Sequence, residues 1–184
     1  YPPGKPVEEV ERELGRTAIK LASNENPLGP SPMAQDALRN YLGRMHYYPD
    51  GGGYYLRKKL AEIHGLNMDE IILGAGSTDL IELVAKTFLG GGDEAITSES
   101  AFYMYRLAIE DMGAGLVLTP MRDMTFDLAA MAHAITQRTK VVYLGNPNNP
   151  TGTMFTAEDL DHFLDDIPPR ILVVLDEAYY HYVQ

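Results

Sequence analysis

Two apolar runs, separated by a helical stretch and each followed by a polar loop, constrain the fold of this sequence most. The first run, residues 141–144, leads into Asn-Pro-Asn-Asn-Pro-Thr-Gly at residues 146–152. The second run, residues 171–175, leads into Asp-Glu-Ala-Tyr at residues 176–179. Short apolar runs that alternate with helices are typical of the strands of a parallel sheet. We therefore expect two parallel strands whose carboxyl ends carry polar loops.

The polar side chains of these loops define a candidate ligand site. In open α/β sheets, ligands bind in the crevice beyond the carboxyl ends of the strands. The sequence places an amide (Asn149), a carboxylate (Asp176) and a phenol (Tyr179) in that position. Such a set is suited to an aromatic, ionisable ligand that is held by its edge.

The composition disfavours several other classes of protein. The chain has 184 residues, of which 45% are hydrophobic, so it can bury a substantial core. Its longest aliphatic run, residues 171–175, is too short to cross a bilayer. The formal charge of −11 disfavours general nucleic-acid binding, because a phosphate backbone would be repelled. Without cysteine there are no disulfides or thiol nucleophiles, and we expect no metal site. These features favour a cytoplasmic α/β protein.

The remaining sequence alternates between strand-like and helix-like segments. The helix-like segments have apolar residues at i, i+3 and i+4, and one of them is expected to turn Ile81, Val84, Ala85 and Phe88 toward the core. This alternation predicts a doubly wound, mostly parallel sheet with right-handed crossovers. We expect further strands at residues 71–73, 95–97 and 116–118, and helices that begin after residues 31, 53, 76, 127 and 156.

The two ends of the chain depart from this pattern. Residues 1–6 are rich in Pro and Gly and predict an extended arm. At the other end the sequence stops at Gln184, directly after its most motif-rich strand. We therefore expect the fold to continue in sequence beyond this chain.

A glycine-rich corner stands between the expected strand at residues 71–73 and the helix that follows it. Its sequence is Gly-Ala-Gly-Ser-Thr at residues 74–78. Backbone N–H groups at the start of a helix attract a phosphate, and the hydroxyls of Ser77 and Thr78 would add donors. The alternative is a plain turn in which Ser77 only caps the helix. The corner is not a dinucleotide fingerprint, because Asp79 stands in place of the third glycine.

The other candidate residues also have structural alternatives. The loop that carries Asn149 contains two X-Pro steps, which favour rigid presentation of a ligand contact, although Asn, Pro and Gly also form ordinary turns. Asp176 can pair with a protonated ring nitrogen or cap a helix. Tyr179 can point into the same site or pack. Phe102 can stack on a flat ligand or belong to the core.

Together these motifs resemble the fold-type I pyridoxal-phosphate aminotransferases, and within them the histidinol-phosphate branch. Asn-Pro-Thr-Gly at residues 149–152 and Asp-Glu-Ala-Tyr at residues 176–179 are typical of the superfamily. Ser-Asn-Glu-Asn-Pro at residues 23–27 and Tyr-Pro-Asp at residues 48–50 are typical of the branch. The resemblance covers nearly the whole chain and corresponds to the N-terminal part of such an enzyme.

The resemblance implies domains and partners. Residues 1–30 would be an N-terminal arm that belongs to a small domain, and residues 31–184 would be part of the large domain that binds pyridoxal phosphate. The protein would form a homodimer in which Tyr48 reaches the cofactor phosphate of the neighbouring subunit. Asn24 would line the substrate entrance.

The resemblance also implies roles for the site residues. Asp176 would keep the pyridine nitrogen protonated, and Asn149 and Tyr179 would hydrogen-bond the 3-oxygen of the ring. Phe102 would stack on the ring face. The cofactor phosphate would be held by the corner residues Gly76, Ser77 and Thr78.

One essential part of this chemistry is not found in the chain. The family uses a lysine to anchor the cofactor as a Schiff base, in a segment downstream of the Asp-Glu-Ala-Tyr strand, and none of the lysines here has that context. The parent protein is expected to transfer an amino group between histidinol phosphate and 2-oxoglutarate. The alternatives are an aromatic amino-acid aminotransferase, a phosphothreonine decarboxylase-like enzyme, and a non-catalytic module that binds the cofactor or dimerises.

Overall fold

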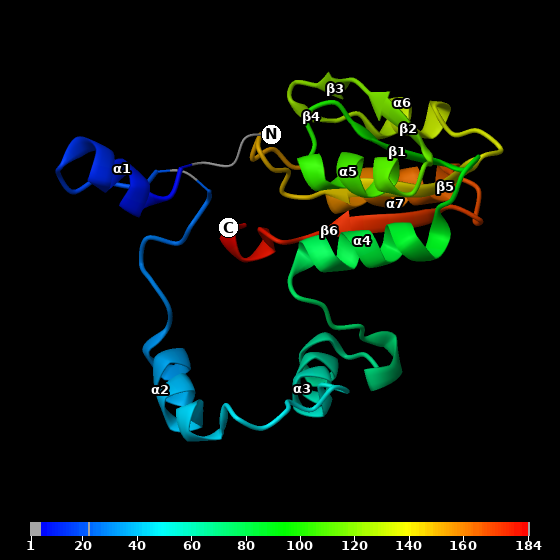
Figure 1. Ribbon diagram of the computed structural model, residues 1–184. Helices are drawn as coiled ribbons and strands as arrows, with labels where there is room; N and C mark the ends of the chain where they lie inside the picture. The colour runs from blue at the N-terminus through cyan, green and yellow to red at the C-terminus, as the bar shows by residue number, and fades with distance from the viewer. Residues whose placement is uncertain (1–4, 22, 184) are drawn as a thin grey trace. The chain divides into compact units, whose positions relative to one another are not determined.

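A computed structural model describes residues 5–21 and 23–183, and the chain separates into two units (Figure 1). One unit ends at Met68 and the other begins at Asp69. The extended arm expected at residues 1–6 lies mostly outside the described residues, because residues 1–4 are not among them. A domain boundary between residues 30 and 31 stays a prediction, since it concerns the domains of a larger fold.

The described part of the first unit contains helices and turns. The helices are α1 (Val7–Leu14), α2 (Pro32–Tyr41) and α3 (Tyr54–His64), and α2 continues into the 3-10 helix η1 (Leu42–Arg44). The predictions of α2 and α3 are confirmed. Proline suits the first position of α2, where an N–H group would have no partner within the helix. Helix α1 was not predicted, because its sequence, Val-Glu-Glu-Val-Glu-Arg-Glu-Leu, contains only three apolar residues.

The second unit is built on a parallel sheet with the strand order β2-β1-β5-β6. Its strands are β1 (Glu94–Ser98), β2 (Gly115–Thr119), β5 (Thr139–Gly145) and β6 (Leu172–Asp176), and each neighbouring pair runs parallel. The predicted fold class is therefore confirmed. After β2 the chain returns past β1 and places β5 on the other side of it. This change of direction between β1 and β5 creates the crevice where α/β sheets bind ligands.

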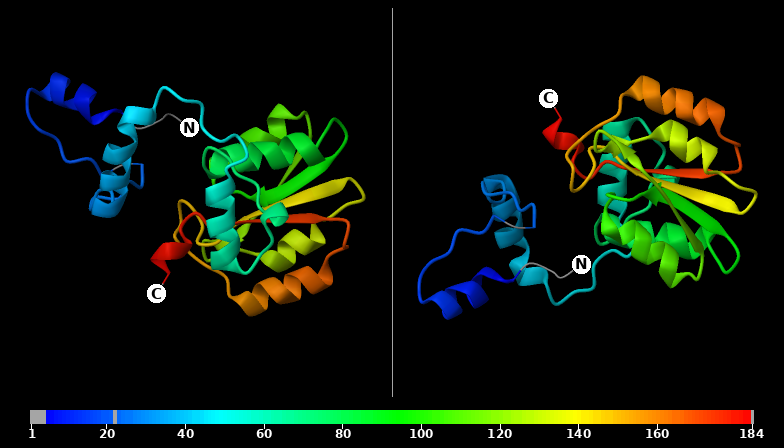
Figure 2. Two further views of the ribbon diagram at one scale, coloured as in Figure 1. Left: turned by 90° about the horizontal axis from the view of Figure 1, so that it is seen from below. Right: turned by 90° about the horizontal axis from the view of Figure 1, so that it is seen from above.

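Helices cover both faces of this sheet (Figure 2). One face carries α4 (Ser77–Phe88) and α5 (Tyr103–Asp111), and the other carries α6 (Leu128–His133) and α7 (Ala157–Asp166). The side chains of β5 alternate between the two cores, as the pleat of a strand requires. Tyr143 packs in the cluster of α4 and α5, whereas Leu144 packs in the cluster of α6 and α7.

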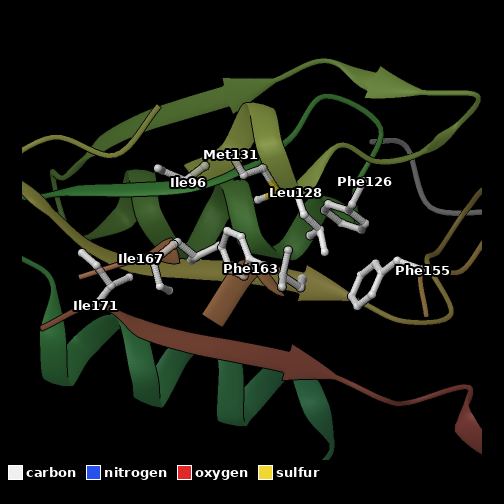
Figure 3. Close-up of a cluster of buried hydrophobic side chains, with 10 residues drawn as sticks. Ile96, Phe126, Leu128, Met131, Phe155, Phe163, Ile167 and Ile171 are labelled. Carbon is white, nitrogen blue, oxygen red and sulfur yellow. The ribbon is translucent and has the colours of Figure 1, made fainter. Parts of the chain in front are cut away.

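The core under α6 and α7 combines aliphatic side chains with three phenylalanines, Phe126, Phe155 and Phe163. Met131 from α6 and Phe163 from α7 face Ile96 of β1 in one cluster (Figure 3). Phe163 is 3% exposed and Met131 is fully buried. Burial of such a side chain contributes about 1.5–3 kcal/mol to stability. This packing holds the sheet in the register that positions the loops at its carboxyl edge.

Two expectations about the second unit are wrong. Residues 71–73 form no strand, because an extended segment needs a neighbouring strand to take up its backbone hydrogen bonds and none of the described strands pairs with it. Phe88 is half exposed, because the buried positions of this helix recur at every fourth residue, through Ile81 and Ala85 to Leu89.

Some smaller elements were not predicted. A short antiparallel hairpin joins β3 (Met121–Arg122) to β4 (Thr125–Phe126). The 3-10 helices η2 (Met68–Glu70) and η3 (Tyr180–Tyr182) are too brief to show a periodic pattern. Among the described residues, no helix has the length and apolar character needed to span a membrane.

Candidate active site

The loops after β1, β5 and β6 and the start of α4 meet around one hollow at the carboxyl edge of the sheet. Five of the residues singled out from the sequence line this hollow, and they come from four separate segments of the chain. Among the residues that the structure describes, the lining is Ser77, Phe102, Tyr105, Pro147, Asn149, Asp176, Ala178 and Tyr179. The hollow therefore lies at the change of strand direction, where the fold predicts a ligand.

The loop after β5 is fixed by the side chains of two asparagines. Asn148 is 3% exposed, and its Nδ2 donates to the carbonyl of Ser100 at 3.1 Å and to Oγ1 of Thr151 at 2.7 Å. Asn146 exchanges two hydrogen bonds with the backbone of Phe155, at 3.2 and 3.1 Å. Asn149, which stands next to Asn148, is left to face the hollow. Side-chain hydrogen bonds thus hold this loop in place, in addition to its two prolines.

Asp176 is the last residue of β6, and both of its carboxylate oxygens accept hydrogen bonds. The backbone N–H of Ala178 donates to Oδ1 at 3.0 Å, and the hydroxyl of Tyr105 donates to Oδ2 at 3.0 Å. The contact with Ala178 closes a short turn, but no helix begins after Asp176, since η3 (Tyr180–Tyr182) starts later with Tyr179 as its N-cap. The helix-cap alternative for Asp176 is therefore wrong. Each carboxylate oxygen has a second lone pair, which leaves capacity for a donor from the hollow.

Asn149 and Tyr179 form the polar side of the hollow. The Nδ2 of Asn149 donates to the hydroxyl of Tyr179 at 3.4 Å, although the two residues are 30 positions apart. Tyr179 therefore points toward Asn149, in agreement with the first of its two expected orientations. A donor amide beside a phenol can hold an oxygen atom of a bound ring.

Phe102 provides an aromatic surface at the start of α5. It is half-buried, lines the hollow, and meets the ring of Tyr105 edge to face with centroids 5.8 Å apart. Its ring can therefore contact both the core and a flat ligand, so the two alternatives for this residue are compatible.

The glycine-rich corner forms the start of α4. Gly76 is the N-cap residue with a φ of +93°, a backbone conformation that favours glycine. It has no side chain to accept hydrogen bonds from the first-turn N–H groups, which have no carbonyl partners within the helix. Asp79 accepts from the N–H of Ala75 at 2.9 Å and stabilises the turn. Ser77 lines the hollow, whereas Gly76 and Thr78 flank it in sequence.

Tyr48 and Asn24 belong to the unit that ends at Met68. Tyr48 is fully exposed in the segment between η1 and α3. Asn24 lies in a turn with a φ of +49°, a conformation that asparagine tolerates better than most residues. Their expected roles at the cofactor and at the substrate entrance stay predictions.

Tyr105 also belongs to the site, although the sequence motifs did not indicate it. It is 1% exposed, and its hydroxyl reaches Asp176 across 71 positions of sequence. Burial, together with the negative charge of Asp176 and the hydrogen bond to it, raises the pKa of the Tyr105 phenol far above its ordinary value. The hydroxyl therefore stays a neutral donor. One signal in the sequence could have indicated this role. Tyr105 follows Phe102 by three residues, a spacing that places both on the same side of α5.

The fold and this arrangement of loops define a member of a known family. The family model for aminotransferase class I and II matches residues 16–184, and the chain belongs to that family. It is 50% identical to histidinol-phosphate aminotransferase 2 of Pseudomonas fluorescens strain Pf-5 and 50% identical to the histidinol-phosphate aminotransferase of Moorella thermoacetica. Each alignment covers 100% of this chain, and 50% and 48% of the respective relatives. The chain thus spans about half the length of these curated relatives.

A solved structure shows the same fold. The crystal structure of histidinol-phosphate aminotransferase from Sinorhizobium meliloti, in complex with pyridoxal-5'-phosphate, superposes with a TM-score of 0.91 at 30% sequence identity. The superposition covers 99% of this chain and 50% of that one. The prediction of the family from the sequence motifs is therefore confirmed.

Proposed function

We propose that this chain forms the cofactor-holding part of a pyridoxal-phosphate aminotransferase that moves an amino group between histidinol phosphate and 2-oxoglutarate. The proposal is supported by the 50% identity to relatives named histidinol-phosphate aminotransferase. The single observation that carries it is the meeting of Asn149, Asp176, Tyr179 and Phe102 around one hollow beside the start of α4.

The residues of the hollow fit the chemistry of the cofactor. Pyridoxal phosphate presents a flat ring, a basic ring nitrogen, a 3-oxygen and a phosphate. The hollow offers an aromatic face, a carboxylate with spare lone pairs, an amide–phenol pair and a helix start with open N–H groups. When bound, the cofactor supplies an electron sink for negative charge that develops at the α-carbon of a substrate.

Each ring contact has a proposed role. Asp176 holds a proton on the ring nitrogen through a charge-assisted hydrogen bond, which keeps the ring electron-poor. Asn149 and Tyr179 hydrogen-bond the 3-oxygen and fix the rotation of the ring in its plane. Phe102 stacks on the ring face and excludes water from that side.

The phosphate is proposed to lie at the start of α4. The N–H groups of the first turn and the hydroxyls of Ser77 and Thr78 donate to its oxygens, and the helix dipole favours its negative charge. Gly76 is needed there because its φ of +93° is strained for other residues.

A homodimer is proposed from the surface of the first unit. Large apolar side chains of this unit are exposed, among them Ile19 (88%), Leu21 (94%) and Leu28 (91%). In its described helices, α3 buries Ala61 while α1 and α2 bury no residue. Apolar surface of this kind is available to contact a second subunit. We propose that Tyr48 contributes to the cofactor site of a second subunit.

Further parts of the proposal follow the family. Asn24 is proposed to line the substrate entrance, and residues 1–30 to form an arm of a small domain. A cytoplasmic location suits an enzyme of amino-acid biosynthesis. These assignments depend on the family resemblance and on the names of the relatives.

The test is an amino-transfer assay on the full-length protein that contains this chain. Glutamate formation from 2-oxoglutarate is measured with either histidinol phosphate or phenylalanine as the amino donor. We expect kcat/KM to be at least about a hundredfold higher for histidinol phosphate, because a site built for a phosphate group rejects donors that lack it. Equal or greater efficiency with phenylalanine would make the protein an aromatic aminotransferase. No transfer from either donor would indicate a non-catalytic module.

A further inference from the structure

We propose that Tyr105 is a positioning residue that fixes the direction of the Asp176 carboxylate toward the ring nitrogen of the cofactor. This inference rests on the proposed function and deepens it. Tyr105 touches the site from within the core, since it is 1% exposed and its hydroxyl donates to Oδ2 of Asp176 at 3.0 Å.

The carboxylate is held at both oxygens by donors from different elements. The N–H of Ala178 belongs to the loop after β6, whereas the hydroxyl of Tyr105 belongs to α5 on one face of the sheet. Contacts at both oxygens oppose rotation of the carboxylate plane about the bond to its β-carbon. If Tyr105 is removed, the contact with Ala178 is the one of these two hydrogen bonds that remains.

Tyr105 is itself rigid because aromatic rings pack around it. Its ring stacks on Tyr143 with centroids 5.3 Å apart and planes inclined by 10°. The rings of Phe102 and Tyr105 meet edge to face with centroids 5.8 Å apart. The hydroxyl of Tyr143 donates to the carbonyl of Ile81 at 3.1 Å, so the stacked ring is also fixed. A rigid support of this kind is what a precise ligand contact requires.

The strand beside Asp176 leaves space for the tyrosine hydroxyl. Gly145 of β5 pairs with Asp176 of β6 in the sheet register. A β-carbon at position 145 would lie 3.1 Å from the Tyr105 hydroxyl oxygen, which is tighter than ordinary contact. A side chain at position 145 would therefore push the hydroxyl by a few tenths of an ångström, and it would also touch Oδ1 of Asn148 at 3.4 Å. Gly145→Ala is expected to displace the hydroxyl without altering Tyr105 or Asp176.

The test is a double-mutant cycle on cofactor affinity in the full-length apo protein. Pyridoxal phosphate is titrated into the wild type, Tyr105→Phe, Asp176→Asn and the double variant. Loss of one hydrogen bond predicts that Tyr105→Phe binds the cofactor about threefold to tenfold more weakly. If Tyr105 acts through Asp176, the same change in the Asp176→Asn background should have almost no effect. A purely structural role would instead weaken binding equally in both backgrounds, and would overturn the proposal.

Two further variants separate the possible causes. Tyr143→Phe is the matched control, because it removes a hydroxyl from the ring stack that does not contact Asp176; its cofactor affinity should equal that of the wild type. Gly145→Ala should weaken binding in the same direction as Tyr105→Phe. Thermal unfolding of each variant verifies that it is folded.

The outcomes distinguish this inference from the proposed function. If Asp176→Asn binds the cofactor as tightly as the wild type, the proposed role of Asp176 fails and the inference falls with it. If Asp176→Asn is weakened while Tyr105→Phe and Gly145→Ala bind like the wild type, only the inference about Tyr105 is overturned.

Discussion

Replacement of Asp176 by asparagine should separate cofactor affinity from fold stability. The amide keeps the shape of the carboxylate and an oxygen that can accept from the N–H of Ala178, which lies 3.0 Å from Oδ1. The hydroxyl of Tyr105, which donates to Oδ2 of the carboxylate, can rotate and accept from the new amide N–H instead. The free energy of unfolding should therefore change by no more than about 1 kcal/mol. The variant loses the negative charge that faces the proposed ring nitrogen. A hydrogen bond that involves charged groups contributes about 1.5–3 kcal/mol.

This loss predicts a measurable change in affinity. At about 1.4 kcal/mol for each factor of ten, cofactor binding should weaken roughly 10- to 150-fold. The dissociation constant is measured by absorbance titration of the full-length apo protein with pyridoxal phosphate, and stability by urea unfolding. Asp161→Asn is the matched control, because it removes the same charge from an exposed position on α7. Equal dissociation constants for the two variants would refute the role of Asp176.

Three predictions concern stability, each measured by urea unfolding. Burial raises the pKa of Tyr143 to about 12, above its ordinary 10.0, so the neutral phenol contributes stability that is lost as the pH rises through this range. This loss is at most roughly 3 kcal/mol, and Tyr143→Phe should remove it. An unchanged pH profile of stability would contradict this. Asp127→Ala removes the side-chain cap of α6, whose Oδ1 accepts from the N–H of Ala130 at 2.9 Å. This variant should lower the free energy of unfolding by about 1 kcal/mol, whereas Asp127→Asn should lower it little. Equal losses of stability would argue against the capping role. Arg138→Ala leaves the Glu94 side chain, which is 9% exposed, without its cation. The free energy of unfolding should fall by about 1–3 kcal/mol. An unchanged free energy of unfolding would show that water replaces the arginine.

The sheet and its helices were predictable because their signals are local. The alternation of Val141 to Leu144 between two cores and the capping of α7 by Thr156 depend on residues close together in sequence. Local signals also predicted a strand at residues 71–73, where none forms. A strand needs a neighbouring strand to pair with, and no local pattern reveals whether one is present.

The candidate site was predictable to the extent that parallel strands bring their carboxyl ends to one edge. This rule was enough to expect Asn149, Asp176 and Tyr179 together, as the hollow now groups them. It could not reveal Tyr105, whose contact with Asp176 depends on the packing of α5 and on the space left at Gly145. The two prolines predicted a rigid Asn149 loop. The hydrogen bonds of Asn146 and Asn148, which also hold this loop, could not be predicted from the sequence.

The most direct test of the central claim is a crystal structure of the full-length protein with pyridoxal phosphate bound. We expect a carboxylate oxygen of Asp176 to lie about 2.7–2.9 Å from the ring nitrogen. We also expect Phe102 over the ring face and the phosphate at the first turn of α4. A ring bound elsewhere, or bound in this hollow with its nitrogen turned away from Asp176, would contradict the proposed site.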